Sequence, residues 1–221
     1  MTNFGGDEVV DCVTVEPFML FDYVKLTNNT AKMDRRCKAN EKFYANAKYT
    51  YDAMLKRIRF KEVGSYENKT FGIDALLLFR EGVMYTINHR NKTCKKERLK
   101  REDFHPMEIP ADAALLGQVI LGSSSGPGQG LLVNTWYGEV ATPSGKDKWV
   151  STFTEVGCIP VSSAYYTDKT GWMLSSFFNI VVGILDPREF FPPKFCQGAL
   201  LDETEEAANF YSIFKNLTKY S

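Results

Sequence analysis

The stretch GWMLSSFFNIVVGILDPREFFPPKFC, residues 171–196, decides the fold of this chain. Its first part, residues 172–185, is apolar and carries no charged side chain. A run of this length fits a buried helix or a buried strand, and the Phe-Phe and Ile-Val-Val groups, with Asn179 and Gly183, favour a strand. The run is shorter than the roughly 20 apolar residues that a membrane-spanning helix needs.

The second part of this stretch ends the strand and continues as an extended arm. Pro187 removes a backbone donor and disfavours helical geometry at Asp186. Two phenylalanines and two prolines follow at positions 190–193, and Cys196 closes the segment. We therefore expect a buried strand that leads into a stiff arm held in place by its cysteine.

Short alternating segments fill the rest of the chain and predict further strands. In residues 56–63, apolar Ile58, Phe60 and Val63 alternate with basic side chains, which is typical of a half-buried antiparallel strand. Other predicted strands cover residues 12–26, 43–51, 71–80, 83–90, 115–121, 131–140, 149–156 and 161–167. Strands at short spacing with turns between them indicate an antiparallel all-β domain.

One helix is predicted, at residues 200–214, where acidic side chains occupy the first turns and apolar side chains recur at helical spacing. No boundary divides the chain. We expect a single domain over residues 1–221, with a loose N-terminal end at 1–11 and a C-terminal helix and tail at 200–221.

Composition narrows the classes of function. Lys plus Arg and Asp plus Glu both number 27, so no bulk charge draws the chain to nucleic acid or to an anionic membrane. Five cysteines lack CxxC spacing, which argues against zinc. Spaced cysteines together with four sequons favour a secretory compartment. The sequon asparagines are Asn28, Asn68, Asn91 and Asn216. Residues 1–11 are short and acidic rather than signal-like, so if the protein is secreted we expect this sequence to be the mature form.

Four blocks in this order resemble the ependymin family. The blocks are Tyr51-Asp52 with residues 56–59 (KRIR), residues 76–85 (LLLFREGVMY) with Cys94, residues 104–110 (FHPMEIP), and the D-P-x-x-F-x-P-P-x-x-C signature at 186–196. The resemblance runs from about residue 12 to about residue 200. It implies two stacked, curved antiparallel sheets forming a half-barrel with a deep hydrophobic pocket, similar to bacterial lipoprotein-carrier folds.

The resemblance also implies covalent links and partners. By position, it pairs Cys12 with Cys158 and Cys94 with Cys196, and it leaves Cys37 without a family counterpart. It implies a homodimer. Family members are associated with calcium, although no calcium ligand is identified in this sequence.

Alternation suggests which side chains line the implied pocket, with the choice of strand face left open. The candidate lining is Leu77, Phe79, Met84, Tyr85, Ile87, Trp136, Phe153, Tyr166, Phe177 and Ile180. Trp136, Tyr137, Trp149, Phe153, Tyr165, Tyr166, Trp172, Phe177 and Phe178 make the second half rich in aromatic strand residues. For any one of these aromatics, packing between the two sheets is the favoured interpretation, but their number is high for a core alone. Burial of an acyl chain at about 25 cal/mol per Å² would drive binding without an ionic contact.

The sequence contains only weak matches to catalytic and metal-binding motifs. Residues 122–126, GSSSG, match the G-x-S-x-G pattern, which needs a strand, a tight elbow and then a helix. Here further glycines and a proline lead into another strand, so we interpret the segment as a loop. His89 and His105 lack metal-ligand spacing, and the basic run 95–101 is interpreted as a solvated face.

The sequence therefore favours a non-enzymatic secreted or lysosomal glycoprotein that binds hydrophobic ligands such as lipids or fatty acids. A calcium ion is the one cofactor considered, and neither nucleic acid nor a transmembrane segment is expected. The alternative is an extracellular matrix or adhesion protein that binds a protein or a glycan. A hydrolase acting through Ser124 is a remote third hypothesis.

Overall fold

The computed structural model describes residues 18–29, 43–66, 69–104, 106–142, 145–167 and 171–202. The first six strands are β1 (Phe18–Asn29), β2 (Phe43–Asp52), β3 (Arg57–Tyr66), β4 (Lys69–Leu78), β5 (Val83–Asn88) and β6 (Thr93–Arg98). The others are β7 (Ala114–Gly122), β8 (Gly130–Thr142), β9 (Gly145–Thr154), β10 (Pro160–Thr167), β11 (Gly171–Val182) and β12 (Leu201–Asp202). Three short 3-10 helices are η1 (Arg101–Asp103), η2 (Pro187–Phe190) and η3 (Lys194–Cys196).

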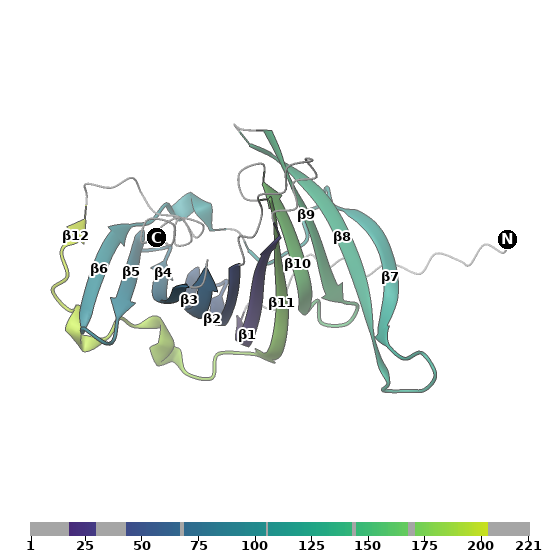
Figure 1. Cartoon of the computed structure of the whole chain (residues 1–221), viewed down its shortest axis with the longest axis horizontal. Helices are drawn as coiled ribbons and strands as arrows, with labels where there is room; N and C mark the ends of the chain where they lie inside the picture. Colours follow the sequence, from purple (N-terminus) through teal and green to yellow (C-terminus); the bar gives the residue numbers. More distant parts are fainter. Residues whose placement is uncertain are drawn as a thin grey trace.

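The strands form one continuous hydrogen-bonded sheet, called the ladder below, in the order β12-β6-β5-β4-β3-β2-β1-β11-β10-β9-β8-β7. Every described pair is antiparallel except β12 with β6, which is parallel. β1 lies between β2 and β11, so the first strand joins the two halves of the ladder (Figure 1). The apolar run of residues 172–185 is β11, as predicted, although the strand ends at Val182.

The ladder curves so that one face, called the inner face, is shared by both halves. Strands β2–β5 and strands β8, β9 and β11 contribute side chains of this face to a single cluster. Its buried members are Ala45, Ala47, Tyr49, Tyr51, Ile58, Phe60, Ala75, Leu77, Phe79, Met84, Leu99, Trp136, Phe153 and Cys158. The prediction of an all-β fold with two curved antiparallel layers is confirmed.

The opposite, outer face of β4–β6 is covered by the C-terminal arm. This arm, residues 186–196 with η2 and η3, is called the strap; it runs along the lower side of Figure 1 from β11 towards β6. A second buried cluster forms beneath it, with Leu76, Leu78, Ile87, Phe190 and Cys196. The predicted extended arm is thus a packed element with two short helical turns.

Three details differ from the sequence expectations. The basic run after residue 93 is not merely a solvated face, because its first part forms β6 and buries Glu97. On β3 the buried row continues from Phe60 to Glu62, while Val63 is 68% exposed. Leu201 and Asp202 begin the predicted C-terminal helix but form β12; most of that prediction, like the loose end at 1–11, lies outside the described residues.

Among the described helices, none is long and apolar enough to span a membrane.

Candidate ligand-binding site

A buried carboxyl lies among mostly apolar side chains on the inner face of β2–β4. On β3, Glu62 lies directly opposite Ala47 of β2 and Ile73 of β4. Ala45 and Ala75, both fully buried, occupy the diagonal positions on the same face. The three alanines are short, whereas Ile73 is a large neighbour, and the Glu62 side chain is itself buried among them.

The linker between β6 and β7 packs against one end of the inner face. Phe104 stacks on Tyr51 with ring centroids 6.0 Å apart and meets Phe79 edge-on at 5.1 Å. The backbone N–H of Met107 donates to the Tyr51 hydroxyl at 3.1 Å. Burial is the main cause that raises the pKa of Tyr51, so its hydroxyl stays protonated and holds the linker. This aromatic group fixes the end of the face near the β2–β3 turn.

The other half of the ladder supplies large aromatic side chains to the same cluster. Trp136 and Phe153 are buried, whereas Trp149 and Phe177 pack against the cluster and stay partly exposed. Trp149 lies across Gly138 of β8, where any Cβ would collide with the indole ring. Glycine at this position therefore lets the tryptophan lie flat over the sheet.

The structure brings together seven of the ten residues predicted to line a pocket. These are Leu77, Phe79, Met84, Trp136, Phe153, Phe177 and Ile180, all in or against the inner cluster. It places Tyr85 and Ile87 on the outer face, in or against the cluster beneath the strap. Tyr166 lies in neither cluster and packs on Trp172 at a centroid distance of 5.3 Å.

Glu62 is the residue of this face that the sequence interpretation missed. Glu62 is 1% exposed, and burial raises the pKa of its carboxyl from 4.5 to about 8. Neither carboxyl oxygen has a hydrogen-bond partner among the described residues. Strict alternation from Ile58 and Phe60 was the available signal, since it puts position 62 in the buried row.

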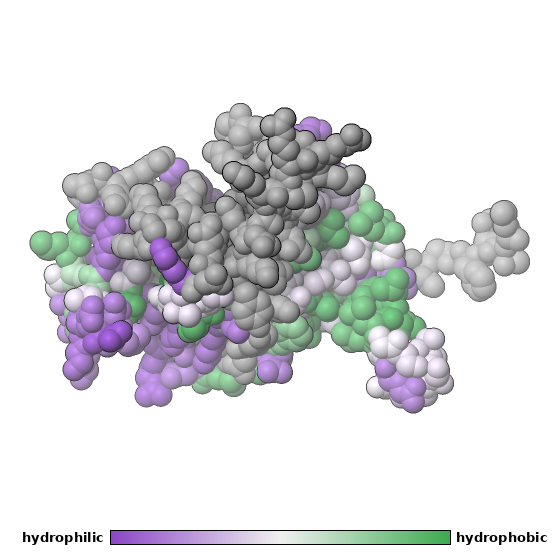
Figure 2. All heavy atoms as spheres, in the orientation of Figure 1, coloured by the Kyte–Doolittle hydropathy of each residue, from purple (hydrophilic) through white to green (hydrophobic). Residues whose placement is uncertain are grey.

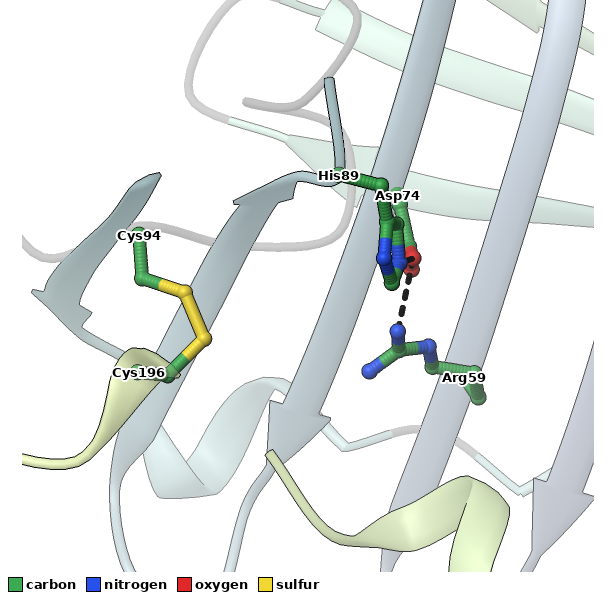
Figure 3. The surroundings of a disulfide bond; sticks show 5 residues. All are labelled: Arg59, Asp74, His89, Cys94 and Cys196. Atoms are coloured by element: carbon green, nitrogen blue, oxygen red, sulfur yellow. Dashed lines mark hydrogen bonds and ion pairs between the residues drawn. A yellow bond between two sulfur atoms is a disulfide. The ribbon is translucent and has the colours of Figure 1, made fainter. Parts of the chain in front are cut away.

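An ionic group lies on the outer face of β3 and β4. Arg59 donates to Asp74 Oδ2 at 2.7 Å, and His89 Nε2 lies 2.7 Å from the same oxygen (Figure 3). Arg59 is almost fully buried, whereas the His89 side chain is 59% exposed and its ring meets Phe195 of the strap edge-on. The group thus links the sheet to the strap.

Two further contacts hold the strap. Glu189 accepts from Lys48 at 3.4 Å and from Lys61 at 3.1 Å. Burial alone would raise the pKa of Glu189, but the hydrogen bonds and charges of the two lysines outweigh it and lower the pKa. Phe190 is buried, and the Arg57 guanidinium lies 4.4 Å from its ring centroid. Apolar burial and charge therefore act together at this position.

Among the described cysteines, the disulfide bonds agree with the pairing that the family resemblance implies. Cys94 is bonded to Cys196 with a Cα–Cα distance of 5.3 Å, which ties the strap to β6 and confirms that prediction (Figure 3). Cys158 is buried and disulfide-bonded, while its predicted partner Cys12 lies outside the described residues, as does Cys37.

Of the sequon asparagines, Asn91 is exposed in the β5–β6 turn and Asn28 belongs to β1. Asn68 and Asn216 lie outside the described residues.

The serine-rich motif is a hairpin loop. Ser123, Ser124 and Ser125 begin the loop of residues 123–129 that connects β7 to β8, and the Ser125 N–H donates to Ser123 Oγ at 3.1 Å. Since a strand follows, the motif lacks the helix that a nucleophile elbow requires. The described residues contain no group of three or more His, Cys, Asp or Glu suited to a metal ion, so no calcium ligands are assigned.

The β7–β8 ribbon, formed by these two strands and their loop, leaves apolar side chains uncovered. Its exposed large apolar residues are Leu115, Leu116, Val119, Ile120, Leu121, Leu131, Leu132 and Val140. β7 is the last strand of the ladder and lacks a partner on one edge within the described sheet. Figure 2 shows hydrophobic surface at the end of the molecule where this ribbon lies.

These features define a disulfide-linked, antiparallel β protein with an apolar inner face shared by both halves of its sheet. The family model for ependymin matches residues 67–196, and the chain belongs to the ependymin family. It is 36% identical over 170 residues to Ependymin-2 of Carassius auratus, covering 77% of each chain. It is 36% identical over 176 residues to Ependymin-1 of Oncorhynchus mykiss, covering 78% of each chain. Identity to Mammalian ependymin-related protein 1 of Mus musculus is 31% over 155 residues, or 68% of this chain and 65% of that one.

Proposed function

We propose that this protein binds hydrophobic molecules, lipids or fatty acids among them, on its inner face and performs no catalysis. The observation that carries the proposal is the apolar inner cluster, whose edge residues stay partly exposed. Phe71 and Ile73 of one half and Trp149, Phe177 and Ile180 of the other combine contact with this cluster and partial exposure. A hydrocarbon chain that covers them removes apolar surface from water at about 25 cal/mol per Å².

Support for a secreted or lysosomal glycoprotein comes from two features. The Cys94–Cys196 disulfide is typical of an oxidising compartment. The sequon at Asn91 lies in an exposed turn, which is a suitable position for an attached oligosaccharide. Treatment of secreted material with a glycosidase, followed by a mass measurement, is expected to remove at least one glycan.

The binding proposal is tested on purified protein. Organic extraction followed by mass spectrometry is expected to release lipid, and a fluorescent fatty-acid probe is expected to bind the delipidated protein. The matched variants are Phe177→Ala at the inner face and Phe191→Ala on the strap, where the side chain is 62% exposed. Only the former is expected to weaken probe binding. Absence of both co-purified lipid and probe binding would refute the proposal.

A second candidate function follows from the β7–β8 ribbon. Its exposed apolar side chains, and an edge of β7 that has no partner strand within the described sheet, suit a protein partner, either a second copy of this chain or a matrix component. We propose a two-fold homodimer as the first partner, because the same patch on each of two copies covers itself. Light scattering at micromolar concentration is expected to give twice the monomer mass.

A further inference from the structure

The inner face contains a buried acidic group for which the described residues offer no hydrogen-bond partner. Glu62 is 1% exposed, and neither of its oxygens receives a hydrogen bond from any described residue. Burial of an unpaired carboxylate is costly, and burial is the single cause that raises the pKa of Glu62 to about 8. Near neutral pH this carboxyl is therefore mostly protonated.

The surroundings of Glu62 are apolar on both adjacent strands. Ala47 on β2 and Ile73 on β4 flank it, and Phe71 continues the same face of β4 towards its partly exposed end. One titratable group, Tyr49 on β2, lies diagonally beside Glu62, because it faces Phe60 where Glu62 faces Ala47. The register places the other titratable groups of the described inner face farther away. These are Tyr51 on β2, Lys95 and Glu97 on β6, Asp202 beside Lys95, Asp147 on β9, Tyr165 on β10 and Glu155 after β9.

We propose that Glu62 receives the polar end of the hydrophobic ligand, and that this ligand is an amphiphile with a protonated amine at the end of its hydrocarbon chain. The inference rests on the function proposed above and adds the chemical class of the ligand. The hydrocarbon chain covers Phe71 and Ile73. Both Glu62 oxygens are shielded from solvent in this structure, so the ammonium group reaches them when the side chains packed over Glu62 move aside.

An amine matches this site better than other polar ends do. An ammonium group donates to both free oxygens and neutralises the carboxylate, and charge-assisted hydrogen bonds are about twice as strong as neutral ones. An ionised fatty acid can only share the one proton that Glu62 holds and is repelled once Glu62 ionises, and an alcohol offers a neutral hydrogen bond alone. On binding, Glu62 loses its proton to solvent while the amine keeps its own, because alkylamines stay protonated below about pH 10.

The experiment compares dodecylamine, dodecanol and dodecanoic acid by calorimetry on the delipidated full chain at pH 6, 7 and 9. Since ionised Glu62 is the form that binds, the Kd for dodecylamine is expected to fall about tenfold from pH 6 to pH 7 and to level off above pH 8. Close to one proton is released per bound amine at pH 6, measured in two buffers of different ionisation enthalpy. The Kd for dodecanol is expected to stay constant.

Two variants assign these effects to a residue. Glu62→Gln is expected to bind dodecanol within about twofold of the parent while losing the amine preference, the pH dependence and the proton release. Glu97→Gln is the matched control, because Glu97 is also buried on the inner face but pairs with Lys95 at 3.0 Å; it is expected to keep all three effects.

Three results would overturn the inference: equal binding of amine and alcohol, no proton release by the parent protein, or an unchanged amine preference in Glu62→Gln. Proton release by the parent decides the matter even if Glu62→Gln fails to fold. If none of the three probes binds, the proposed function fails too; if dodecanol binds and the amine has no advantage, the inference alone fails.

Discussion

The two halves of the ladder differ in what covers their outer sides. In the half formed by β2–β6, Leu76, Leu78 and Ile87 point outward and are buried beneath the strap. In the half formed by β7–β11, outward side chains such as Phe178 of β11 are 46% exposed, and β7 is exposed along nearly its whole length. Both halves carry apolar side chains on their outer faces. The halves differ because the strap buries these side chains in the β2–β6 half only.

The largest expected effect comes from releasing the strap at its disulfide. The Cys94–Cys196 bridge closes a loop with a sequence separation of 102, for which the chain-entropy model gives about 4–5 kcal/mol. Replacing both cysteines by serine is expected to lower the free energy of unfolding by about that amount, measured by urea denaturation. The single variants should match the double variant, because either one removes the whole bridge. Additive single effects would show that the cysteines act separately.

Truncating a buried side chain of the strap tests how firmly the strap packs on the sheet while the disulfide stays intact. Phe190 is 2% exposed against the sheet, so Phe190→Ala is expected to cost about 3–5 kcal/mol of stability. Its neighbour Phe191 is 62% exposed, and Phe191→Ala is expected to change stability by no more than about 0.5 kcal/mol. Equal effects of the two substitutions would mean that the strap does not pack on the sheet as described.

Glu62 provides a pH-dependent test of the inner face. Because folding raises its pKa from 4.5 to about 8, its contribution to stability is fully present below pH 4.5 and is lost as the pH rises through 8. Glu62→Gln removes this titration. Between pH 4.5 and pH 9, the free energy of unfolding of the variant is therefore expected to rise by roughly 2–4 kcal/mol relative to that of the parent. Parallel stability–pH curves for parent and variant would contradict the raised pKa.

The smallest effect on stability is expected in the uncovered half. Leu116 is 60% exposed on β7, so Leu116→Lys is expected to change the free energy of unfolding by about 0.5 kcal/mol or less. The same variant is expected to weaken self-association, seen as a lower mass by light scattering, because it places a charge in the apolar ribbon. Val63→Lys is the control: Val63 is equally exposed but lies on β3, away from this ribbon.

The strands of the ladder could be predicted from the sequence, whereas the faces of some strands could not. On β3 the basic residues mark one face, and Ile58 and Phe60 were correctly assigned to the other. On β5 this signal is absent, because Met84 faces the inner cluster while Ile87 is buried beneath the strap. A strand covered on both sides is apolar on both sides, so alternation carries no information about direction.

Charged residues in buried rows limited the prediction elsewhere. Glu62 interrupts an apolar row, so Val63 was assigned to that row in its place, and Glu97 sits in a run of basic residues that did not suggest a strand. The Cys94–Cys196 bridge was predicted from the family resemblance, because spacing alone does not select one pairing among five cysteines.

The position of β1 between β2 and β11 has a consequence for biosynthesis. A ribosome produces the chain from its N-terminal end at about 5–20 residues per second, so β11 follows β1 after roughly 8–30 s. During that interval a sheet of β1–β6 has an open backbone edge at β1, where nascent chains pair with one another most readily. We therefore expect translation of this protein to depend on a chaperone that shields β1 until β11 has emerged, and ribosome-bound chains truncated before residue 171 to aggregate when released.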